Sequence, residues 1–459
     1  MSADAAIREG NRLRDLGHVD AAIGAYRRCL AEQPDRDEAR RNLLVALLSS
    51  TRLNADERFA EHLAFGERLA ARAPAQMVPL ANIADPNRRL RLGYLSSNFA
   101  NHPVGRAIRP LFEHRDRQAF QIFCYAENEM LDPVGDHLRG LADGWRGTMG
   151  CSDSMVANMI RSDQIDILIC LAGHLDRNRL AVCAHRSAPI QVSYHDAATS
   201  GLAAMDYLLT DRFLSPPHDT ELFTERLIRL PSLMYMPFPD GALAPSPRQH
   251  GGKVVFGGFN SPAKTSPEIL ELWAALLRRV AESRLLLRWR DAYDDPVLCQ
   301  DLRNFFSARG ISADRLELRG RADGHPLNIY NDVDITLDSY PFSGSTVSLE
   351  SLWMGVPVIT WSGAGMVGRW SAALLNAVGL GHLVATDGAD YIERAAALAA
   401  AEDFRDGLRL TLRDRVATSP LCYGPGKCRQ VERLFRAIWR RWCLGQKFPA
   451  QSGRGIVNP

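Results

Sequence analysis

Short apolar runs alternate with helical stretches along most of the chain, and this alternation occurs twice, on either side of a connector rich in proline and glycine at residues 237–252. The runs that we expect to form buried strands are residues 90–95, 120–125, 165–170, 190–194 and 207–209 in the first series, and residues 254–256, 285–287, 316–318, 335–337 and 356–360 in the second. Strands that alternate with helices build parallel sheets with helices on both faces. The sequence therefore predicts two doubly wound α/β domains of about 150 residues each. Because such sheets bind ligands beyond the carboxyl ends of their strands, we expect the ligand in a cleft between the two facing domains.

Helical segments flank these two domains. Near the N-terminus, the sequence resembles the helix–turn–helix unit of a tetratricopeptide repeat. The resemblance lies in the spacing of Gly10, Leu13, Gly17, Ala22, Tyr26 and Pro34. One and a half repeats cannot form a stable solenoid, so this cap must pack on the following domain, either as a plain helical hairpin or as a surface that recruits a partner. The predicted division is a helical region at 1–75, a linker at 76–89, an N-terminal α/β domain at 90–240, a C-terminal α/β domain at 253–420, a C-terminal helix packing back at 421–445 and a flexible tail at 446–459.

Composition excludes several classes of protein. A formal net charge of +2 argues against a nucleic-acid binder held by phosphate contacts. Nine cysteines without CxxC spacing suggest neither a zinc site nor a disulfide framework. No run approaches the roughly 18 apolar residues of a membrane span, and residues 1–14 lack the apolar core of a signal peptide. We therefore expect a cytoplasmic protein without a membrane span.

Lys264 is the first candidate for chemistry. It follows a predicted strand, stands near Asn260 and precedes a helical pattern. A lysine at the entrance of a helix can compensate the charge that grows on a diphosphate leaving group. The alternative is a solvated surface lysine.

A second stretch, at residues 337–350, follows another predicted strand and opens another helix. Gly344 permits close backbone approach, while Ser345 and Thr346 supply two hydroxyls at the helix start, where free N–H groups attract anions. Plain N-capping explains most such hydroxyls. Glu350, one turn further on, could accept both hydroxyls of a ribose or simply compensate the helix dipole. Only together with Lys264 do these residues indicate a nucleotide site. Asn260, beside Lys264, is counted among the candidate nucleotide-sugar-binding residues, which assigns this binding to the domain at 253–420.

These stretches resemble the catalytic region of the O-GlcNAc transferase and SPINDLY family, glycosyltransferases with the two-domain GT-B fold of two Rossmann-like domains. The similarity runs from the tetratricopeptide-like start to about Trp442 and includes the blocks at residues 93–99, 101–103, 165–174, 186–191, 206–211 and 349–357. Glu350 and the run at residues 378–384 place the chain nearer the SPINDLY branch.

The resemblance implies roles for single residues. His102 matches the family histidine at the reacting centre, and Lys264 matches the lysine that binds the donor diphosphate. Ser345 and Thr346 match positions that contact phosphate and sugar, and Glu350 matches the acid that holds the ribose. The remaining matches are Arg369, a family arginine, and His325, which falls close to a family histidine near the nucleotide although its spacing to Tyr330 is one residue longer than usual.

The loop after residues 190–194 departs from the family pattern. Where the family commonly has a Gly-Tyr-Pro-Gly-Thr-type loop, this chain keeps only the Thr-Ser-Gly end. A loop that loses its glycine and proline changes shape. His195 and Asp196 could form a new acid–base pair, or make only a local polar contact. With His174, they are the candidates for the acceptor side of the site.

The function predicted is that of an inverting, metal-independent glycosyltransferase without a cofactor. It would move a sugar from a nucleotide-diphosphate donor, of the UDP-N-acetylglucosamine or GDP-fucose type or another, to serine or threonine of an acceptor protein, which the helical cap could recruit. Because the cap is short, we expect few acceptors, such as one dedicated bacterial surface or flagellar protein. Two alternatives stay open, namely a glycan or lipid acceptor and a non-catalytic scaffold that binds nucleotide sugars.

Overall fold

The computed structural model describes residues 2–74, 79–128, 130–235, 244–246, 253–321 and 324–445. The chain divides into two compact units. Unit 1 consists of Met1–Leu53 and Phe238–Cys422, and unit 2 of Asn54–Pro237 and Tyr423–Pro459. The tail predicted at 446–459 and most of the connector at 237–252 lie outside the described residues.

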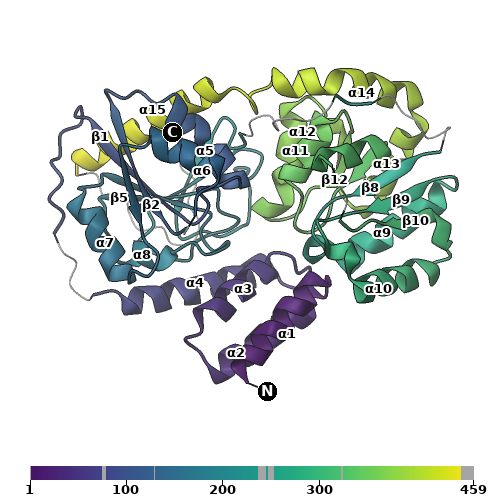
Figure 1. The fold of residues 1–459 in the computed structure, drawn as a ribbon, viewed down its shortest axis with the longest axis horizontal. Helices are drawn as coiled ribbons and strands as arrows, with labels where there is room; N and C mark the ends of the chain where they lie inside the picture. Colours follow the sequence, from purple (N-terminus) through teal and green to yellow (C-terminus); the bar gives the residue numbers. More distant parts are fainter. Residues whose placement is uncertain are drawn as a thin grey trace. The chain divides into compact units, whose positions relative to one another are not determined.

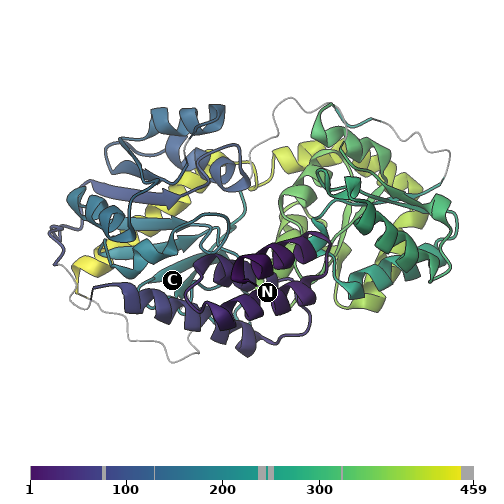
Figure 2. The same cartoon turned by 60° about the horizontal axis from the view of Figure 1, so that its bottom comes forward.

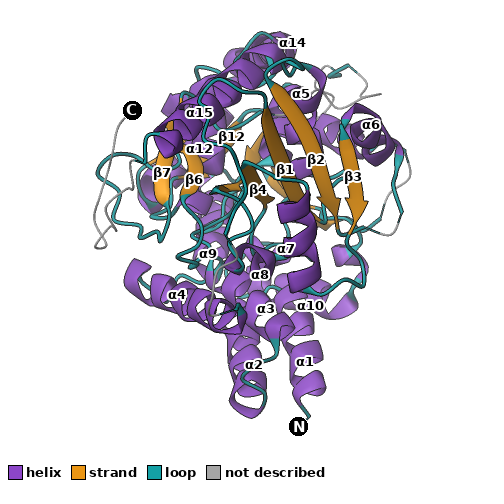
Figure 3. Cartoon of the chain, turned by 90° about the vertical axis from the view of Figure 1, so that its left-hand side faces the viewer, coloured by secondary structure: helices purple, strands orange, loops and turns teal. Residues whose placement is uncertain are grey.

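Unit 2 is built on a parallel sheet of seven strands in the order β3-β2-β1-β4-β5-β6-β7, and the succession β3, β2, β1 can be followed in Figure 3. The strands are β1 (Leu90–Ser96), β2 (Phe120–Ala126), β3 (Gly144–Gly147), β4 (Ile167–Leu171), β5 (Ile190–Tyr194), β6 (Tyr207–Asp211) and β7 (Arg226–Leu230). The order reverses between β1 and β4. In doubly wound sheets this reversal is where ligands bind, at the carboxyl ends of the strands.

Helices cover both faces of this sheet. They are α4 (Ala55–Arg72), α5 (Pro103–Glu113), α6 (Pro133–Leu141), α7 (Asp153–Ser162), α8 (Leu180–Ala184) and α15 (Gly424–Cys443). Helices α5, α6 and α15 lie on one face, and α7 and α8 on the other (Figures 1 and 3). The C-terminal helix α15 packs on α5, and its Glu432 accepts a hydrogen bond from the backbone N–H of Asp116 at 2.7 Å.

Unit 1 contains a second parallel sheet, of six strands in the order β10-β9-β8-β11-β12-β13. These are β8 (Val255–Gly258), β9 (Arg284–Leu287), β10 (Leu316–Leu318), β11 (Ile335–Leu337), β12 (Val358–Trp361) and β13 (Val384–Ala385). Its α-helices after the cap are α9 (Pro267–Arg279), α10 (Pro296–Ser307), α11 (Thr346–Trp353), α12 (Trp370–Ala377), α13 (Gly388–Ala400) and α14 (Glu402–Ala417). Here the order reverses between β8 and β11. The prediction of two doubly wound α/β sheets is confirmed.

Short 3₁₀-helices join several of these elements in unit 1. They are η1 (Pro262–Lys264), η2 (Ala292–Asp294), η3 (Ala313–Arg315), η4 (Pro326–Asp332), η5 (Met366–Arg369) and η6 (Gly381–Leu383).

The N-terminal cap consists of α1 (Ala3–Asp15), α2 (Val19–Glu32) and α3 (Asp37–Leu47), which lie side by side in Figure 2. The ring of Tyr26 packs on Gly10, where a Cβ atom would lie 2.5 Å from the ring. This close packing of two helices is consistent with a tetratricopeptide-like cap. The predicted helical region 1–75 is divided, because α1–α3 belong to unit 1 and α4 to unit 2.

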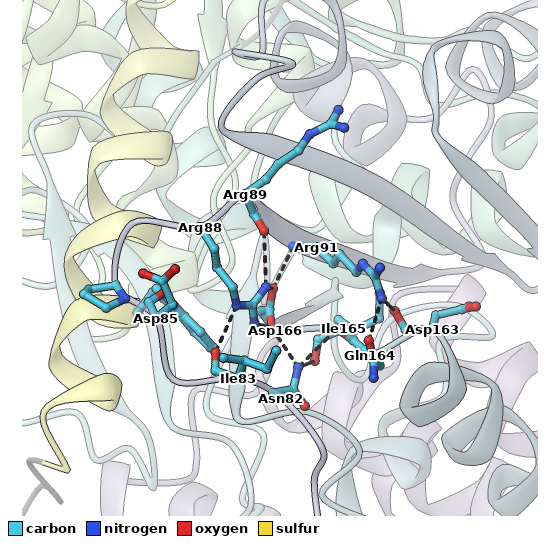
Figure 4. A network of polar contacts seen from close by, with 12 residues as sticks. Asn82, Ile83, Asp85, Arg88, Arg89, Arg91, Asp163, Gln164, Ile165 and Asp166 are labelled. Atoms are coloured by element: carbon cyan, nitrogen blue, oxygen red, sulfur yellow. Dashed lines mark hydrogen bonds and ion pairs between the residues drawn. The ribbon is translucent and has the colours of Figure 1, made fainter.

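The part of the predicted linker that the structure describes is fastened to unit 2 (Figure 4). The buried carboxylate of Asp166 accepts hydrogen bonds from the guanidinium of Arg88, from the amide of Asn82 at 2.7 Å and from the backbone N–H of Arg91 at 2.8 Å. The Arg88 guanidinium also lies 4.7 Å from the ring centroid of Trp439 on α15. These contacts hold the chain in place directly before β1.

Candidate functional site

The Lys264 amine of unit 1 faces the loop that precedes α11. Lys264 ends η1, after β8, and its Nζ donates to the Ser343 carbonyl at 3.3 Å. The same Nζ lies 4.0 Å from the ring centroid of Phe342 and 5.7 Å from that of Trp370. Because β8 and β11 are the neighbours at which the strand order reverses, the structure brings Lys264 to the loop at residues 338–346.

Burial changes the chemistry of this amine. Desolvation lowers the pKa of Lys264 from 10.5 to about 8, and the Asp338 carboxylate opposes that change. Below pH 8 the amine is therefore mostly protonated and can neutralise an anion. Near pH 8, the fraction of the Lys264 amine that is protonated depends strongly on the charged groups around it.

Asp338 organises the loop that the amine faces, and we did not single it out in the sequence. Its buried carboxylate accepts hydrogen bonds from the backbone N–H groups of Ser339 at 2.9 Å and Gly344 at 2.7 Å, and from the Thr360 hydroxyl at 2.7 Å. Burial raises its pKa. A carboxylate directly after a buried strand and before a run of small residues is the signal that could have identified it.

Asn260 is tied to the same carboxylate. Its Nδ2 donates to Asp338 Oδ1 at 3.0 Å, and its side chain is buried. Asn260 therefore lies at the predicted place, between β8 and Lys264, and its amide nitrogen supports the loop of Asp338.

The stretch of Gly344, Ser345 and Thr346 forms the entrance of α11. A Cβ atom at Gly344 would collide with the hydroxyl of Ser348, so only glycine fits there. Ser345 is the N-cap residue, but its side chain makes no capping hydrogen bond, and Thr346 is the first helical residue. Plain capping thus does not account for the Ser345 hydroxyl, and the α11 entrance offers its N–H groups beside the Lys264 turn.

Glu350 is held one turn inside α11. Its Oε2 accepts a hydrogen bond from the Tyr330 hydroxyl at 3.3 Å, and that hydroxyl also contacts the Val347 carbonyl at 3.0 Å. Burial first, and then the Glu350 carboxylate, raise the pKa of Tyr330. The acid is therefore oriented by a neutral tyrosine donor.

Arg369 and His325 support their own loops in unit 1. Arg369 donates to the carbonyls of Gly363 at 3.1 Å and Ala364 at 2.6 Å. His325 is the N-cap of η4, and its Nδ1 accepts the N–H of Leu327 at 3.3 Å.

His102 of unit 2 caps α5, in the loop after β1. Its Nδ1 accepts the N–H of Val104 at 3.3 Å, and its Nε2 lies 3.6 Å from Asp176 Oδ2. An Nδ1 that accepts a hydrogen bond leaves the proton of the neutral ring on Nε2. The ring is therefore arranged to donate from Nε2.

The loop that carries Asp176 follows β4, at the reversal point of this sheet. The Asn98 amide donates to Asp176 Oδ2 at 2.9 Å, and the buried Asn178 donates to Asn98 Oδ1 at 2.9 Å. Asp176 and Asn178 are further site residues that we missed, because nothing in the sequence indicates that this loop meets the one after β1.

Two of the three acceptor-side candidates are buried and engaged elsewhere. His174 is only 5% exposed, its Nε2 lies 3.1 Å from the Thr199 carbonyl, and its ring packs 5.0 Å from that of His62 on α4. Asp196 accepts hydrogen bonds from the Ser193 hydroxyl at 3.1 Å and the Ala197 N–H at 2.8 Å. These contacts do not fit side chains that bind an acceptor. The contacts of Asp196 agree with the second interpretation given above, in which it makes only a local polar contact.

His195 does not form the acid–base pair that we considered. It has a left-handed backbone with φ of 58°, and its ring stacks on Tyr194 at 4.2 Å. Desolvation lowers its pKa to about 3, while burial raises the pKa of Asp196 to about 6. The imidazole is therefore neutral at physiological pH. The Asp196 carboxylate is bonded to Ser193 and the backbone instead.

Within the described parts of the chain, no group of three or more His, Cys, Asp or Glu side chains is placed to hold a metal ion. Among the helices of those same parts, none combines the length and apolarity needed to cross a membrane.

Comparison with known proteins places these features in a family. The family model described as glycosyl transferase family 41 matches residues 41–238 and 248–429. The SPINDLY protein of Arabidopsis thaliana, described as a probable UDP-N-acetylglucosamine–peptide N-acetylglucosaminyltransferase, is 34% identical over 430 residues, which are 90% of this chain and 46% of that protein. Its counterpart in Eustoma exaltatum is 36% identical over 93% of this chain and 47% of its own length. The chain thus spans about half the length of these relatives.

A solved structure agrees with these sequence matches. The O-GlcNAc transferase of Thermobaculum terrenum, in a mutant form, superposes with a TM-score of 0.90 and 36% identity, over 97% of this chain and 86% of that one.

Proposed function

Because the chain belongs to glycosyl transferase family 41, we propose that it transfers a sugar from a nucleoside-diphosphate donor to serine or threonine of a protein. The observation that carries this proposal is the meeting of the Lys264 amine with the loop that leads into α11. An ammonium, two hydroxyls and the N–H groups of a helix entrance are the groups that bind a diphosphate.

In the proposed reaction, the acceptor oxygen forms a bond to the anomeric carbon as the bond from that carbon to the diphosphate breaks. The electron pair of the broken bond goes to the diphosphate, and attack from the opposite face inverts the anomeric carbon. Lys264 and the α11 entrance stabilise the negative charge as it develops, which lowers the barrier because these groups are already in position. The acceptor proton leaves to water.

We assign to His102 the role of orienting the acceptor hydroxyl. Its Nδ1 already accepts the Val104 N–H, and its Nε2 faces Asp176. A ring held in this way can donate a hydrogen bond, whereas a general base needs a nitrogen lone pair that can take a proton.

The donor base is tested by thermal unfolding with UDP, GDP, CMP and their sugars. We expect one nucleotide, at about 100 times its dissociation constant, to stabilise the fold by about 2.7 kcal/mol. That corresponds to a rise of about 5 to 10 °C in the unfolding midpoint. Lys264→Ala should lose most of this rise. No shift with any nucleotide in the parent protein would contradict a donor site.

The acceptor is proposed to be one dedicated bacterial surface or flagellar protein, recruited by the cap of α1–α3. To test the acceptor, the active enzyme and a labelled donor sugar are incubated with a panel of whole-cell proteins. EDTA is present because transfer is proposed to need no metal. One or a few labelled bands are expected. Many bands would overturn the narrow range, and label in glycan or lipid alone would overturn the protein acceptor.

A further inference from the structure

The turn between α1 and α2 lies directly against the turn that carries Lys264. Gly17, at the centre of the cap turn, has a φ of +84°, and a Cβ atom there would lie 3.0 Å from the carbonyl oxygen of Pro262. Pro262 is the first residue of η1 and Lys264 is the last. The backbone of the cap therefore touches the donor-lysine turn at a position where only glycine is unstrained.

Two side-chain contacts from the cap, and one from the segment that follows α3, reach the helices that come after η1. Arg12 forms an ion pair with Asp295, the N-cap of α10. His18 Nε2 lies 3.3 Å from Asp301 Oδ2, also on α10. The Thr51 hydroxyl donates to Glu268 Oε1 at 2.7 Å, in the first turn of α9. The contacts thus reach the helix that directly follows η1 as well as the next one.

A hollow of about 220 Å³ adjoins the Gly17 contact. It is lined by Leu16 and His18 from the cap, by Pro262 and Thr265 from the lysine turn, and by Leu298 among the apolar residues of unit 1. An apolar cavity of about 150 Å³ already has room for benzene, so packing on this side of the lysine turn is incomplete. Pro262 therefore borders this hollow and also meets the backbone at Gly17.

We propose that the α1–α2 turn is a brace for the donor lysine, with Gly17 as a positioning residue that sets how deeply the Lys264 amine is buried. From the present position of η1, the amine reaches Ser343 and Phe342. If the brace moves, the amine withdraws from the α11 entrance. The predicted effect of the brace on donor binding rests on the proposed function. Its predicted effect on the burial of the Lys264 amine does not.

The test substitutes Gly17→Ala in the full chain. The added methyl group meets Pro262 at 3.0 Å and the left-handed backbone becomes strained, so η1 should shift. Desolvation lowers the pKa of Lys264 to about 8 in the parent protein, and the variant should titrate closer to 10.5. Titration is followed by NMR of ¹³C-methylated lysine amines, with Lys264→Arg to assign the signal. Affinity for UDP and GDP, measured by calorimetry at pH 7, should fall about 3- to 10-fold for the nucleotide that binds.

Gly24→Ala is the matched control. Gly24 lies within α2, and a Cβ there would meet only the Arg28 guanidinium, at 3.7 Å. The control should keep the lysine titration and the nucleotide affinity of the parent.

The outcomes separate the brace from a purely structural contact. A Gly17→Ala protein that melts earlier but keeps the parent's lysine titration and nucleotide affinity would overturn the proposal. If Gly17→Ala does not fold, Arg12→Ala loosens the cap without backbone strain and should shift the titration in the same direction, and no shift would again overturn it. If the parent binds none of UDP, GDP and CMP, the donor-site proposal fails, while the lysine titration still decides on the brace.

Discussion

Lys264→Ala is expected to reduce kcat about 100- to 1000-fold, the usual cost of removing one group that stabilises charge in the transition state. The fold should survive, because the amine of Lys264 is held by a single carbonyl and two aromatic rings. Transfer to acceptor protein and donor affinity are measured together with the unfolding midpoint. Lys253→Ala, which removes an exposed lysine paired with Glu282, is the control that should leave all three unchanged.

The pH dependence of the same variant gives a second, independent result. Burial lowers the pKa of Lys264 to about 8, so the folded chain binds fewer protons than the unfolded chain between pH 8 and 10.5. Without ligand, stability should therefore rise with pH across this window, and donor affinity should fall as the amine loses its charge. Both trends should vanish in Lys264→Ala. Full transfer activity in that variant would exclude the proposed role.

Asp338→Ala is expected to lower the free energy of unfolding by about 4 kcal/mol, because several buried donors lose their acceptor at once. The backbone N–H of Gly344, the amide of Asn260 and the hydroxyl of Thr360 all bond to this carboxylate. The α11 entrance would loosen as a result, and nucleotide affinity should fall with stability. Urea unfolding and calorimetry of nucleotide binding measure the two effects.

Asp338→Asn separates the charge from the hydrogen bonds. An asparagine oxygen can still accept from Gly344 and Asn260, so at least half of the stability loss should be recovered. The carboxylate that opposes the desolvation of Lys264 is gone, however, and the lysine should titrate below pH 8. Asp403→Ala removes an exposed carboxylate at the start of α14 and is the control for losing an acidic side chain. Equal stability of Asp338→Ala and the parent would contradict the central role of this residue.

The sheets were predictable because their central strands are buried on both faces. Strand β4 and its neighbour β5 are continuous apolar runs, as parallel strands covered by helices must be. The edge strands β3 and β7 were missed. Strand β3 has the sequence Gly-Trp-Arg-Gly and β7 contains two arginines, so neither carries the pattern of a buried strand.

The candidate site was predictable only in part. Lys264 and the run from Gly344 to Glu350 could be identified because helix entrances after strands have a recognisable composition. The function of Asp338 within that site could not, since the hydrogen bond that ties its carboxylate to the Asn260 amide joins residues 78 positions apart. His174 and Asp196 were candidates for the acceptor side, and only the packing of α4 and of the β5 loop shows that they are engaged inside unit 2.

By itself, the sequence determined the class of fold, the positions of the turns that carry Lys264 and Gly344, and the residue types that could meet an anion, because these depend on local periodicity and composition. Tertiary structure alone decided the order of the strands. That order makes β8 the neighbour of β11 and β1 the neighbour of β4, and so brings Lys264 to the α11 entrance and Asp176 to His102. Strand order follows from the packing of whole helices and sheets, which no local pattern in the chain records.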